Sequence, residues 1–488
     1  MVQMIPIGDD CFVVSDLHLA EGNLDRGRTL GTENFFSDGV FSEMLQHLES
    51  SYHQKKSKPC CLIINGDFVD FIRITRIPET KEQFHLWQNE LNKVDPHFII
   101  PSSCISGREK KYGLRTNNYK SVWKLYCAIL GHPVLFEALS QWISSGNQLI
   151  INVGNHDPEW YWKWVQDYLK IRLWEMTGKQ SQLQASFQNN ILFSIAAFSL
   201  YDKVWIDHGH NYEKVTCMDP DYEYDLVAPK QKLFSKRRPQ NVKKEFEKEL
   251  FISFGSFLNR YLINRVEFDF PHVDNLSIKG SMFRALLDEN FEKVIKIFAN
   301  FGGYAVLVLK KNFQLSIIRF LIWLVFVLAP IIMFVYLFSN PPTELFIKTK
   351  SLNSFWKVIL NGFTNLFIPL LSRWALKKIL LWLKLTDPPL SESAFRDLEK
   401  GGKLAGYDYI VLGHNHHPQH IIKDGKEYLN SGTWTSKYVQ KYERIESGVT
   451  YNLVYLSKSS TGSIQTCLMI WNTNNKKLEP YSNFITNA

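Results

Sequence analysis

Residues 61–70 read CLIINGDFVD, a short apolar run followed at once by glycine and two aspartates. The run CLIIN has the length and the β-branched content of a buried strand. Asp67 and Asp70 come directly after it. A strand buried in a sheet is a rigid base, and the loop after its carboxyl end holds functional side chains. This stretch therefore predicts a strand whose end carries a polar site.

The same pattern occurs four more times along the chain. Each apolar run is followed by ligand-type side chains: 11–15 (CFVVS) before DLH, 148–153 (QLIINV) before GNHD, 203–207 (KVWID) before HGH, and 408–412 (DYIVL) before GHNHH. The stretches 38–50 and 159–177 have apolar residues at helical spacing. Strands alternating with helices predict an α/β fold, with five loops meeting at one sheet edge.

The side chains after these runs form a metal-ligand set. They supply nitrogen and oxygen donors and no cysteine, which suits Mn²⁺, Fe or Zn²⁺ better than a thiolate site would. Seven ligands are too many for one ion, but they fit two ions that share a carboxylate and lie roughly 3.5–4 Å apart. The candidates are Asp16, His18, Asp67, Asn155, His208, His414 and His416.

The five blocks DLH, GDFVD, GNHD, HGH and GHNH, in this order, resemble the signature blocks of the calcineurin-like metallophosphoesterases. The resemblance covers roughly residues 10–212 and 405–435. It implies an αββα sandwich of two mixed sheets. It also implies a hydrolase that cleaves a phosphate ester or anhydride with two divalent metal ions, Mn²⁺ foremost and Fe or Zn²⁺ as alternatives.

The resemblance assigns roles position by position. The first metal would be held by Asp16, His18, Asp67 and His416. Asp67 would bridge to the second, which Asn155, His208 and His414 would complete. His156 would be the general acid for the leaving oxygen, oriented by Asp157, and a bridging hydroxide would be the nucleophile.

Other polar residues near the motifs receive lesser expectations. Asp70 is expected to be structural or to lie behind the ligands, and His210 to be an outer residue or a substrate contact. His417 and His420 are expected at the surface or behind the ligands. Asn430 is expected to cap a turn.

The stretch YLNSGTWT, residues 428–435, resembles a segment of the UDP-2,3-diacylglucosamine pyrophosphatases. Those enzymes typically carry arginine where this chain has His156. This difference argues against the lipid substrate of that family. It does not affect the predicted metal ligands.

Residues 213–400 break the pattern and are interpreted as a helical insertion between two parts of a catalytic domain, 1–212 and 401–488. The run 320–338 is uncharged over its whole length, within the range of about 17–25 residues that cross a bilayer. Both ends of an insertion lie on one side of a membrane. The expectation is therefore two crossings, with 355–376 as the weaker second, or a dip into one leaflet.

The charges around these segments indicate an orientation. Lys310, Lys311 and Arg319 precede the first segment, and basic residues also follow the second, which places the catalytic domain on the cytosolic face of a cell membrane. The run 230–248 holds eight Lys or Arg, and an anionic membrane surface is the expected partner. An equally good interpretation of the run 230–248 is a solvated charged helix or a loop. No recognised nucleic-acid motif is present, so no nucleic-acid partner is expected.

The totals are typical of a folded protein in a reducing compartment. The chain has 488 residues, a net charge of +8 and seven scattered cysteines, a number and spacing that predict free thiols. The N-terminus has no signal-peptide pattern.

The leading hypothesis is a membrane-associated dinuclear phosphohydrolase whose substrate includes a lipid-linked phosphate. One alternative is a soluble, cytoplasmic phosphodiesterase or protein phosphatase whose insertion is a cap. Another is a scaffold that keeps the fold without catalysis.

Overall fold

The computed structural model describes residues 3–4, 9–22, 32–55, 58–213, 216–217, 248–250, 252–269, 389–435, 438–441, 444–447 and 449–481. The chain divides into two units, one of residues 1–230, 238–283 and 389–488, the other of 231–237 and 284–388. All described residues belong to the first unit. The expected segments 320–338 and 355–376 lie outside them, as does the basic run apart from Lys248.

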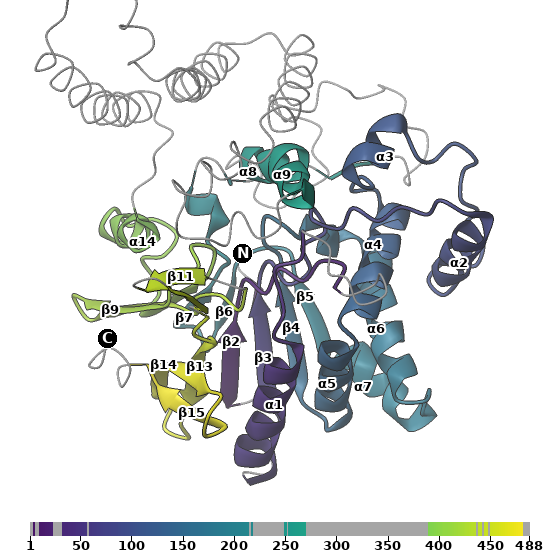
Figure 1. Ribbon diagram of the computed structural model, residues 1–488. Coiled ribbons are helices and arrows are strands. Elements are labelled where there is room, and N and C mark those ends of the chain that lie inside the picture. Colours follow the sequence, from purple (N-terminus) through teal and green to yellow (C-terminus); the bar gives the residue numbers. More distant parts are fainter. Residues whose placement is uncertain are drawn as a thin grey trace, which may run out of the picture. The chain divides into compact units, whose positions relative to one another are not determined.

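A seven-stranded mixed sheet forms the centre of this unit (Figure 1). Its order is β15-β14-β13-β2-β3-β4-β5, with β2 to β5 parallel and the rest antiparallel. The strands are β2 (Asp10–Val14), β3 (Cys60–Asn65), β4 (Gln148–Asn152), β5 (Ile191–Ser194), β13 (Asn452–Lys458), β14 (Ile464–Asn472) and β15 (Lys477–Pro480).

A second mixed sheet has six strands in the order β1-β6-β7-β8-β10-β9. In it β7, β8 and β10 run parallel, so β7 and β8 point their carboxyl ends the same way. The strands are β1 (Gln3–Met4), β6 (Phe198–Leu200), β7 (Val204–Ile206), β8 (Tyr409–Leu412), β9 (Gln419–Lys423) and β10 (Lys426–Asn430). A separate hairpin joins β11 (Tyr438–Lys441) to β12 (Arg444–Ser447).

The two sheets pack face to face because their strands are apolar on both faces. In β2, Cys11 and Val13 join the core between the sheets, which also contains Ile206 and Val411. Phe12 of the same strand joins the core beneath the helices. Alternate side chains of a strand point to opposite faces, so a continuous apolar run supplies both cores.

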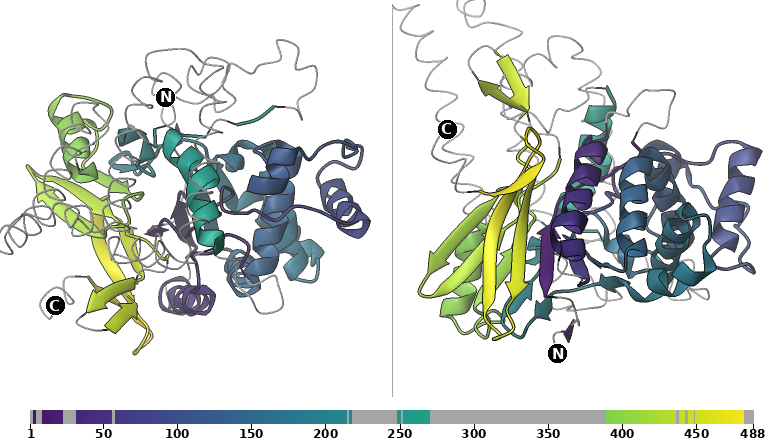
Figure 2. Two further views of the ribbon diagram at one scale, coloured as in Figure 1. Left: turned by 45° about the horizontal axis from the view of Figure 1, so that its top comes forward. Right: turned by 90° about the horizontal axis from the view of Figure 1, so that it is seen from below.

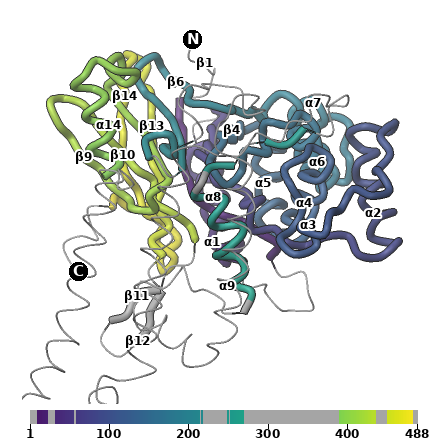
Figure 3. The backbone as a smooth tube through the Cα atoms, turned by 90° about the horizontal axis from the view of Figure 1, so that it is seen from above, coloured from purple at the N-terminus to yellow at the C-terminus, as the bar shows by residue number. Residues whose placement is uncertain are grey.

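Helices cover the outer faces of both sheets. The helices that follow β2, β3 and β4 pack on the seven-stranded sheet, whereas α14 packs on the outer face of the six-stranded sheet. Figure 3 shows α14 beside β9 and β10, on the opposite side of the strands from α4, α5 and α6. Figure 2 shows the same separation between the blue helices and the green and yellow strands. The described part is therefore an α/β sandwich of two mixed sheets.

Local signals account for several helix ends. Thr80 and Gln83 form a capping box at α2, and Pro133 occupies the first turn of α5. The helices are α1 (Asp38–Leu48), α2 (Lys81–Asn92), α3 (Gly107–Tyr112), α4 (Asn118–Gly131), α5 (Pro133–Ser144), α6 (Lys163–Met176), α7 (Gln184–Asn189), α8 (Phe254–Leu258), α9 (Asn264–Asp269) and α14 (Leu390–Glu399). A π-helical turn, η6 (Asn259–Ile263), joins α8 to α9.

The five predicted strands are confirmed as β2, β3, β4, β7 and β8, and the two predicted helical stretches contain α1 and α6. The range predicted as an insertion is not uniform. Residues 213–230, 238–283 and 389–400 belong to the same unit as the strands. No single described helix is long and apolar enough to cross a membrane, although α4 and α5, bent by 96° at their junction, pass that test as a pair.

A cluster of charged side chains, His132, Glu33 and Asp38, joins the α4–α5 junction to the loop after β2, and we call it the clasp. The His132 ring lies 3.1 Å from a carboxylate oxygen of Glu33 and 3.1 Å from one of Asp38. Glu33 also accepts backbone N–H groups of Ala20 and Gly22, close to the first ligand motif. The clasp therefore holds the loop that carries Asp16 against the helical layer.

The clasp predicts a fall in stability as the pH rises. Burial alone would lower the pKa of His132, but Glu33 and Asp38 outweigh it and raise that pKa to about 10. A raised pKa contributes stability that is complete below about pH 6.5, the ordinary value for imidazole, and that is lost as the pH approaches the folded-state value. We expect His132→Gln to be less stable than wild type at pH 6, by on the order of 2 kcal/mol.

Urea unfolding at several pH values measures this difference. The two proteins should converge in stability by about pH 10, because neutral histidine and glutamine then carry the same charge. His85→Gln, at an exposed position of α2, is the matched control and should follow wild type throughout. A wild-type advantage that stays constant with pH would contradict the assigned charge.

Candidate metal centre

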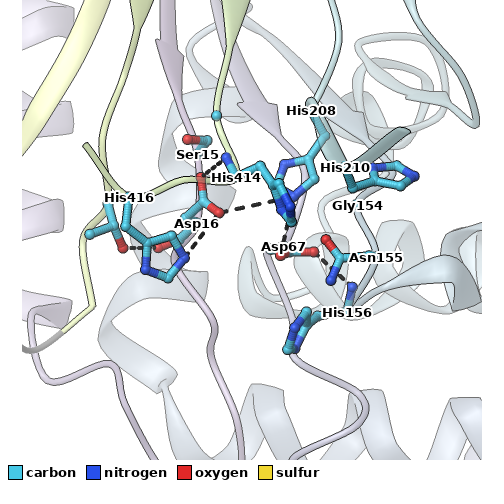
Figure 4. A network of polar contacts seen from close by, with 12 residues as sticks. Ser15, Asp16, Asp67, Gly154, Asn155, His156, His208, His210, His414 and His416 are labelled. Atoms are coloured by element: carbon cyan, nitrogen blue, oxygen red, sulfur yellow. Dashed lines mark hydrogen bonds and ion pairs between the residues drawn. The ribbon is translucent and has the colours of Figure 1, made fainter. Parts of the chain in front are cut away.

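All seven predicted ligands lie on loops at the carboxyl ends of parallel strands. Asp16 follows β2, Asp67 follows β3 and Asn155 follows β4, while His208 follows β7 and His414 follows β8. The two sheets thus contribute to one edge of the sandwich. Figure 4 shows these side chains converging from both sheets.

Five of the ligands have left-handed backbone conformations. Their φ values are 54° at Asp16, 51° at His18, 51° at Asp67, 70° at His414 and 59° at His416. Residues other than glycine adopt such angles at a cost of order 1–3 kcal/mol each, and they do so mainly at functional sites. Backbone bonds from Asp16 N to Gly66 O (3.1 Å) and from His18 N to Asp67 O (2.8 Å) help to hold these turns.

Glycines make room where the loops approach each other. A Cβ on Gly154 would lie 2.1 Å from Oδ1 of Asp67, and one on Gly413 would lie 2.8 Å from Oδ2 of Asp16. One on Gly66 would lie 2.4 Å from Nδ1 of His208. The glycines of the GD, GNH and GHNH blocks are therefore required by contact with the ligands themselves.

The candidate ligand atoms form overlapping groups around the buried carboxylates. Asp16, His18 and His416 bring their ligand atoms within 4.8 Å of one another, and so do Asp67, His208 and His414. His18 Nε2 lies 3.8 Å from Asp16 Oδ1 and 3.6 Å from Asp67 Oδ2, so it stands between the groups. His18, Asp67 and His156 form a third group of this kind, so the groups share His18 and Asp67.

Hydrogen bonds fix which nitrogen of the His208 and His18 rings faces the centre. Nδ1 of His208 donates to the carbonyl of Asn65 at 2.8 Å, and Nδ1 of His18 donates to Oδ2 of Asp70 at 2.9 Å. Each ring therefore presents Nε2 to the carboxylates. A histidine that ligates a metal is typically held in this way by a carbonyl or carboxylate on its other nitrogen.

Several buried atoms at the centre have no hydrogen-bond partner. They are Asp16 Oδ1, Asn155 Oδ1 and His208 Nε2. His208 Nε2 lies 3.2 Å from Asp67 Oδ2 and Asp16 Oδ1 lies 3.3 Å from His416 Nε2, both without hydrogen-bond geometry. Buried polar atoms are otherwise almost always satisfied, so a cluster of lone pairs fits a bound cation.

The buried carboxylates and the imidazoles at the centre stabilise each other's charged forms. Burial would raise the pKa of the Asp16 carboxyl, but His208, His18 and His416 outweigh it and hold that pKa well below its usual range. Burial would lower the pKa of His208, but Asp67 and Asp16 raise it to about 10. The two carboxylates thus draw a proton onto His208, and a cation that binds here would displace that proton.

His156 is oriented by Asp70 and not by Asp157. Its Nδ1 lies 2.7 Å from Oδ2 of Asp70, the same oxygen that holds His18. The Asp157 carboxylate instead accepts the N–H groups of Gly154 (2.6 Å) and Phe68 (2.8 Å) and of the Trp160 indole (3.0 Å). Fully buried and pointed into the loop, Asp157 shapes the backbone beneath the site, so the expected orienting role was wrong.

The remaining polar residues lie around the ligands. His210 is buried beside His208, with ring centroids 5.4 Å apart. Asn430 accepts the N–H of Gly432 at 2.9 Å and donates to the carbonyl of Gly413 at 2.7 Å, so it caps the predicted turn. His417 and His420 are exposed, as expected.

Asp70 was expected to be structural or to lie behind the ligands, and its bonds to His18 and His156 put it behind them. Sequence reasoning missed two other contacts to the site. Glu213 lies 3.1 Å from Nε2 of His414, and Ser256 contacts Asn155. Neither Glu213 nor Ser256 belongs to a motif, so they carried no local signal.

No protein-family model matches the chain, and no curated protein matches it significantly. The assignment of a candidate metal centre therefore rests on the chain's own motifs and on the geometry of these side chains.

The contact between Gly154 and Asp67 gives a direct test of the centre. We expect Gly154→Ala to abolish tight Mn²⁺ binding, because the new Cβ displaces the Asp67 carboxylate. Gly39→Ala is the matched control, since Gly39 is an exposed residue of α1 with open space at its Cβ. Calorimetric titration with Mn²⁺ measures both variants. Undiminished binding by Gly154→Ala would place the metal elsewhere.

Proposed function

We propose that this chain is a dinuclear metallophosphoesterase of the calcineurin-like type, with the αββα arrangement of that family. The observation that carries the proposal is the pair of buried carboxylates, Asp16 and Asp67, with histidines and Asn155 around them. Three buried atoms there have no hydrogen-bond partner: Asp16 Oδ1, Asn155 Oδ1 and His208 Nε2. Oxygen and nitrogen donors of this number suit two divalent ions better than one.

One ion would be held by Asp16, His18, Asp67 and His416, and the other by Asp67, Asn155, His208 and His414. When bound, two divalent ions supply a nucleophile at neutral pH, by lowering the pKa of a water, and neutralise charge on the phosphoryl group. Mn²⁺ is the favoured ion, with Fe and Zn²⁺ as alternatives that the donor set also accepts.

His156 would protonate the leaving oxygen. Asp70 holds Nδ1, so Nε2 is the nitrogen that can exchange a proton with a substrate. The backbone N–H of His156 donates to Oδ1 of Asp67 at 2.8 Å, which fixes the ring beside the ligands. A single Asp70 oxygen thus sets both the metal ligand His18 and the acid His156.

A cavity of about 310 Å³ adjoins the centre beside His416. Its lining includes Gln419, Thr433, Thr450 and Tyr481. Pockets of roughly 300 Å³ and above accommodate small organic ligands. The cavity gives the organic part of a phosphate ester a place next to the ions.

Membrane association remains part of the proposal and rests on the sequence of 320–338, which is uncharged and long enough to cross a bilayer. A lipid-linked phosphate is the substrate class that this segment favours. The alternatives are a soluble phosphodiesterase and a non-catalytic scaffold. The experiments below distinguish them from the proposed function.

Substitution of the shared carboxylate tests the central claim. We expect Asp67→Asn to lose most bound metal and all hydrolysis, because both ions use this side chain. Asp202→Asn is the control, as Asp202 also has a left-handed φ, of 62°, but is exposed. Metal analysis is combined with a panel of monoester, diester, nucleotide-sugar anhydride and phospholipid. Metal-loaded wild type that hydrolyses none of them would support the scaffold.

Removal of the proposed acid should separate catalysis from metal binding. We expect His156→Ala to retain both ions and to lose about 10²–10⁴-fold in kcat. The loss should shrink for substrates with good leaving groups, which need little protonation. Asp70→Asn should in addition weaken metal binding, because Asp70 also holds His18. Equal losses for good and poor leaving groups would remove His156 from the role of acid.

Excision of the apolar segments tests the membrane part. With residues 309–384 replaced by a short flexible linker, we expect hydrolysis of a soluble chromogenic diester to persist. Hydrolysis of a phospholipid in vesicles should fall steeply, since the anchoring segments are gone. If both activities fall together, or if the shortened protein still sediments with vesicles, the membrane proposal is wrong.

A further inference from the structure

A serine from outside the five motifs contacts a proposed metal ligand. Ser256 lies in α8, between the fourth and fifth ligand loops along the chain, and is fully buried. Its hydroxyl donates to the backbone carbonyl of Asn155 at 2.8 Å. The same oxygen accepts the hydroxyl of Ser253 at 3.0 Å and the Nδ2 group of Asn155 at 3.5 Å. One donated and two accepted bonds use the full capacity of a hydroxyl group.

This bonding pattern selects one orientation of the Asn155 amide. The single proton of the Ser256 hydroxyl is committed to the Asn155 carbonyl, so the oxygen offers lone pairs to the side chain. Nδ2 of Asn155 can face those lone pairs, whereas Oδ1 would be repelled by them. Oδ1 is therefore directed away from Ser256, and it is one of the buried atoms at the centre without a hydrogen bond. A metal ion is coordinated by the oxygen of an amide and not by its NH₂ group.

The segment that carries Ser256 is bound tightly to the loops below it. We call residues 248–250 and 252–269 the strap; Figure 1 shows its helices α8 and α9, in teal, above the carboxyl ends of β2, β3 and β4. Arg260 donates to the carbonyls of Gly113 and Leu114 at 2.8 and 2.6 Å, and Asn264 donates to that of Ile72 at 2.9 Å.

A buried ion pair fixes the far end of the strap. Glu267 lies 2.5 Å from Nη1 of Arg73, and both side chains are almost fully buried. Nε of Arg73 lies 3.5 Å from Asp70, the residue that holds His18 and His156. A buried pair of this kind is costly to break from one side, so the strap has a defined position over the site.

We propose that Ser256 is a positioning residue for the second metal. It orients the Asn155 amide so that Oδ1, and not Nδ2, is the ligand atom. The proposal rests on the dinuclear site proposed above. It means that the region between the fourth and fifth motifs completes the metal centre.

The test is metal affinity in the full-length protein, measured by calorimetric titration with Mn²⁺. Ser256→Ala should weaken the second Mn²⁺ by roughly 10–100-fold, the usual effect of removing a partner that orients a ligand, and should leave the first unchanged. Ser253→Ala is the matched control. It removes the side-chain cap of α8 and so weakens the strap, but it leaves both Ser256–Asn155 hydrogen bonds in place. Its thermal midpoint should fall while its Mn²⁺ affinities stay at the wild-type values.

A double-mutant cycle separates orientation from a merely structural role. An aspartate at position 155 has two equivalent oxygens, so its orientation needs no selection. Ser256→Ala should therefore cost second-site affinity in the Asn155 protein and little or none in the Asn155→Asp background.

Three outcomes would overturn the proposal: unchanged affinities in Ser256→Ala, equal losses in Ser253→Ala, or equal losses in both backgrounds of the cycle. Wild-type protein that binds no Mn²⁺ would instead overturn the proposed function, and this inference with it.

Discussion

Two carboxylates, Asp16 and Asp67, are buried at the point where the two sheets meet, and their negative charge is the constraint around which the site is built. Removing such groups from water is costly unless positive charge or donors compensate them. In this chain the compensation comes from imidazoles delivered by four different loops, and from backbone N–H groups of His156 and His414. The left-handed turns and the close glycine contacts follow from the need to bring these loops within a few ångströms of two small side chains.

Much of this arrangement is predictable from the sequence because it depends on short-range pattern. Apolar runs of strand length were identified correctly, and the polar residues after them converge because parallel strands end at a common edge. Asn430 was also predictable, since an asparagine before Ser-Gly favours a turn through its own side chain. These inferences require neighbours in the sequence and no knowledge of tertiary contacts.

The errors and omissions concern contacts between distant segments. Asp157 follows His156 directly, yet its side chain bonds Gly154, Phe68 and Trp160, because a fully buried carboxylate is satisfied by the donors that surround it. The orienting role falls to Asp70, 86 positions away from His156. Ser256 lies in a range that composition marked as an insertion. Its contact with Asn155 depends on how the strap crosses the loops, which no periodicity encodes.

The pairing of β2 with β13 has a consequence for how the protein is made. Val13 pairs with Val454, so the central sheet closes between segments at opposite ends of the chain. At about 5–20 residues per second, translation separates the synthesis of these strands by on the order of a minute. During that time the apolar edge of β2 has no partner on that side, and His416 does not yet exist to join Asp16. Sheet closure and completion of the proposed metal centre are therefore late events in biosynthesis, and the edge of β2 is open to aggregation until the last strands emerge.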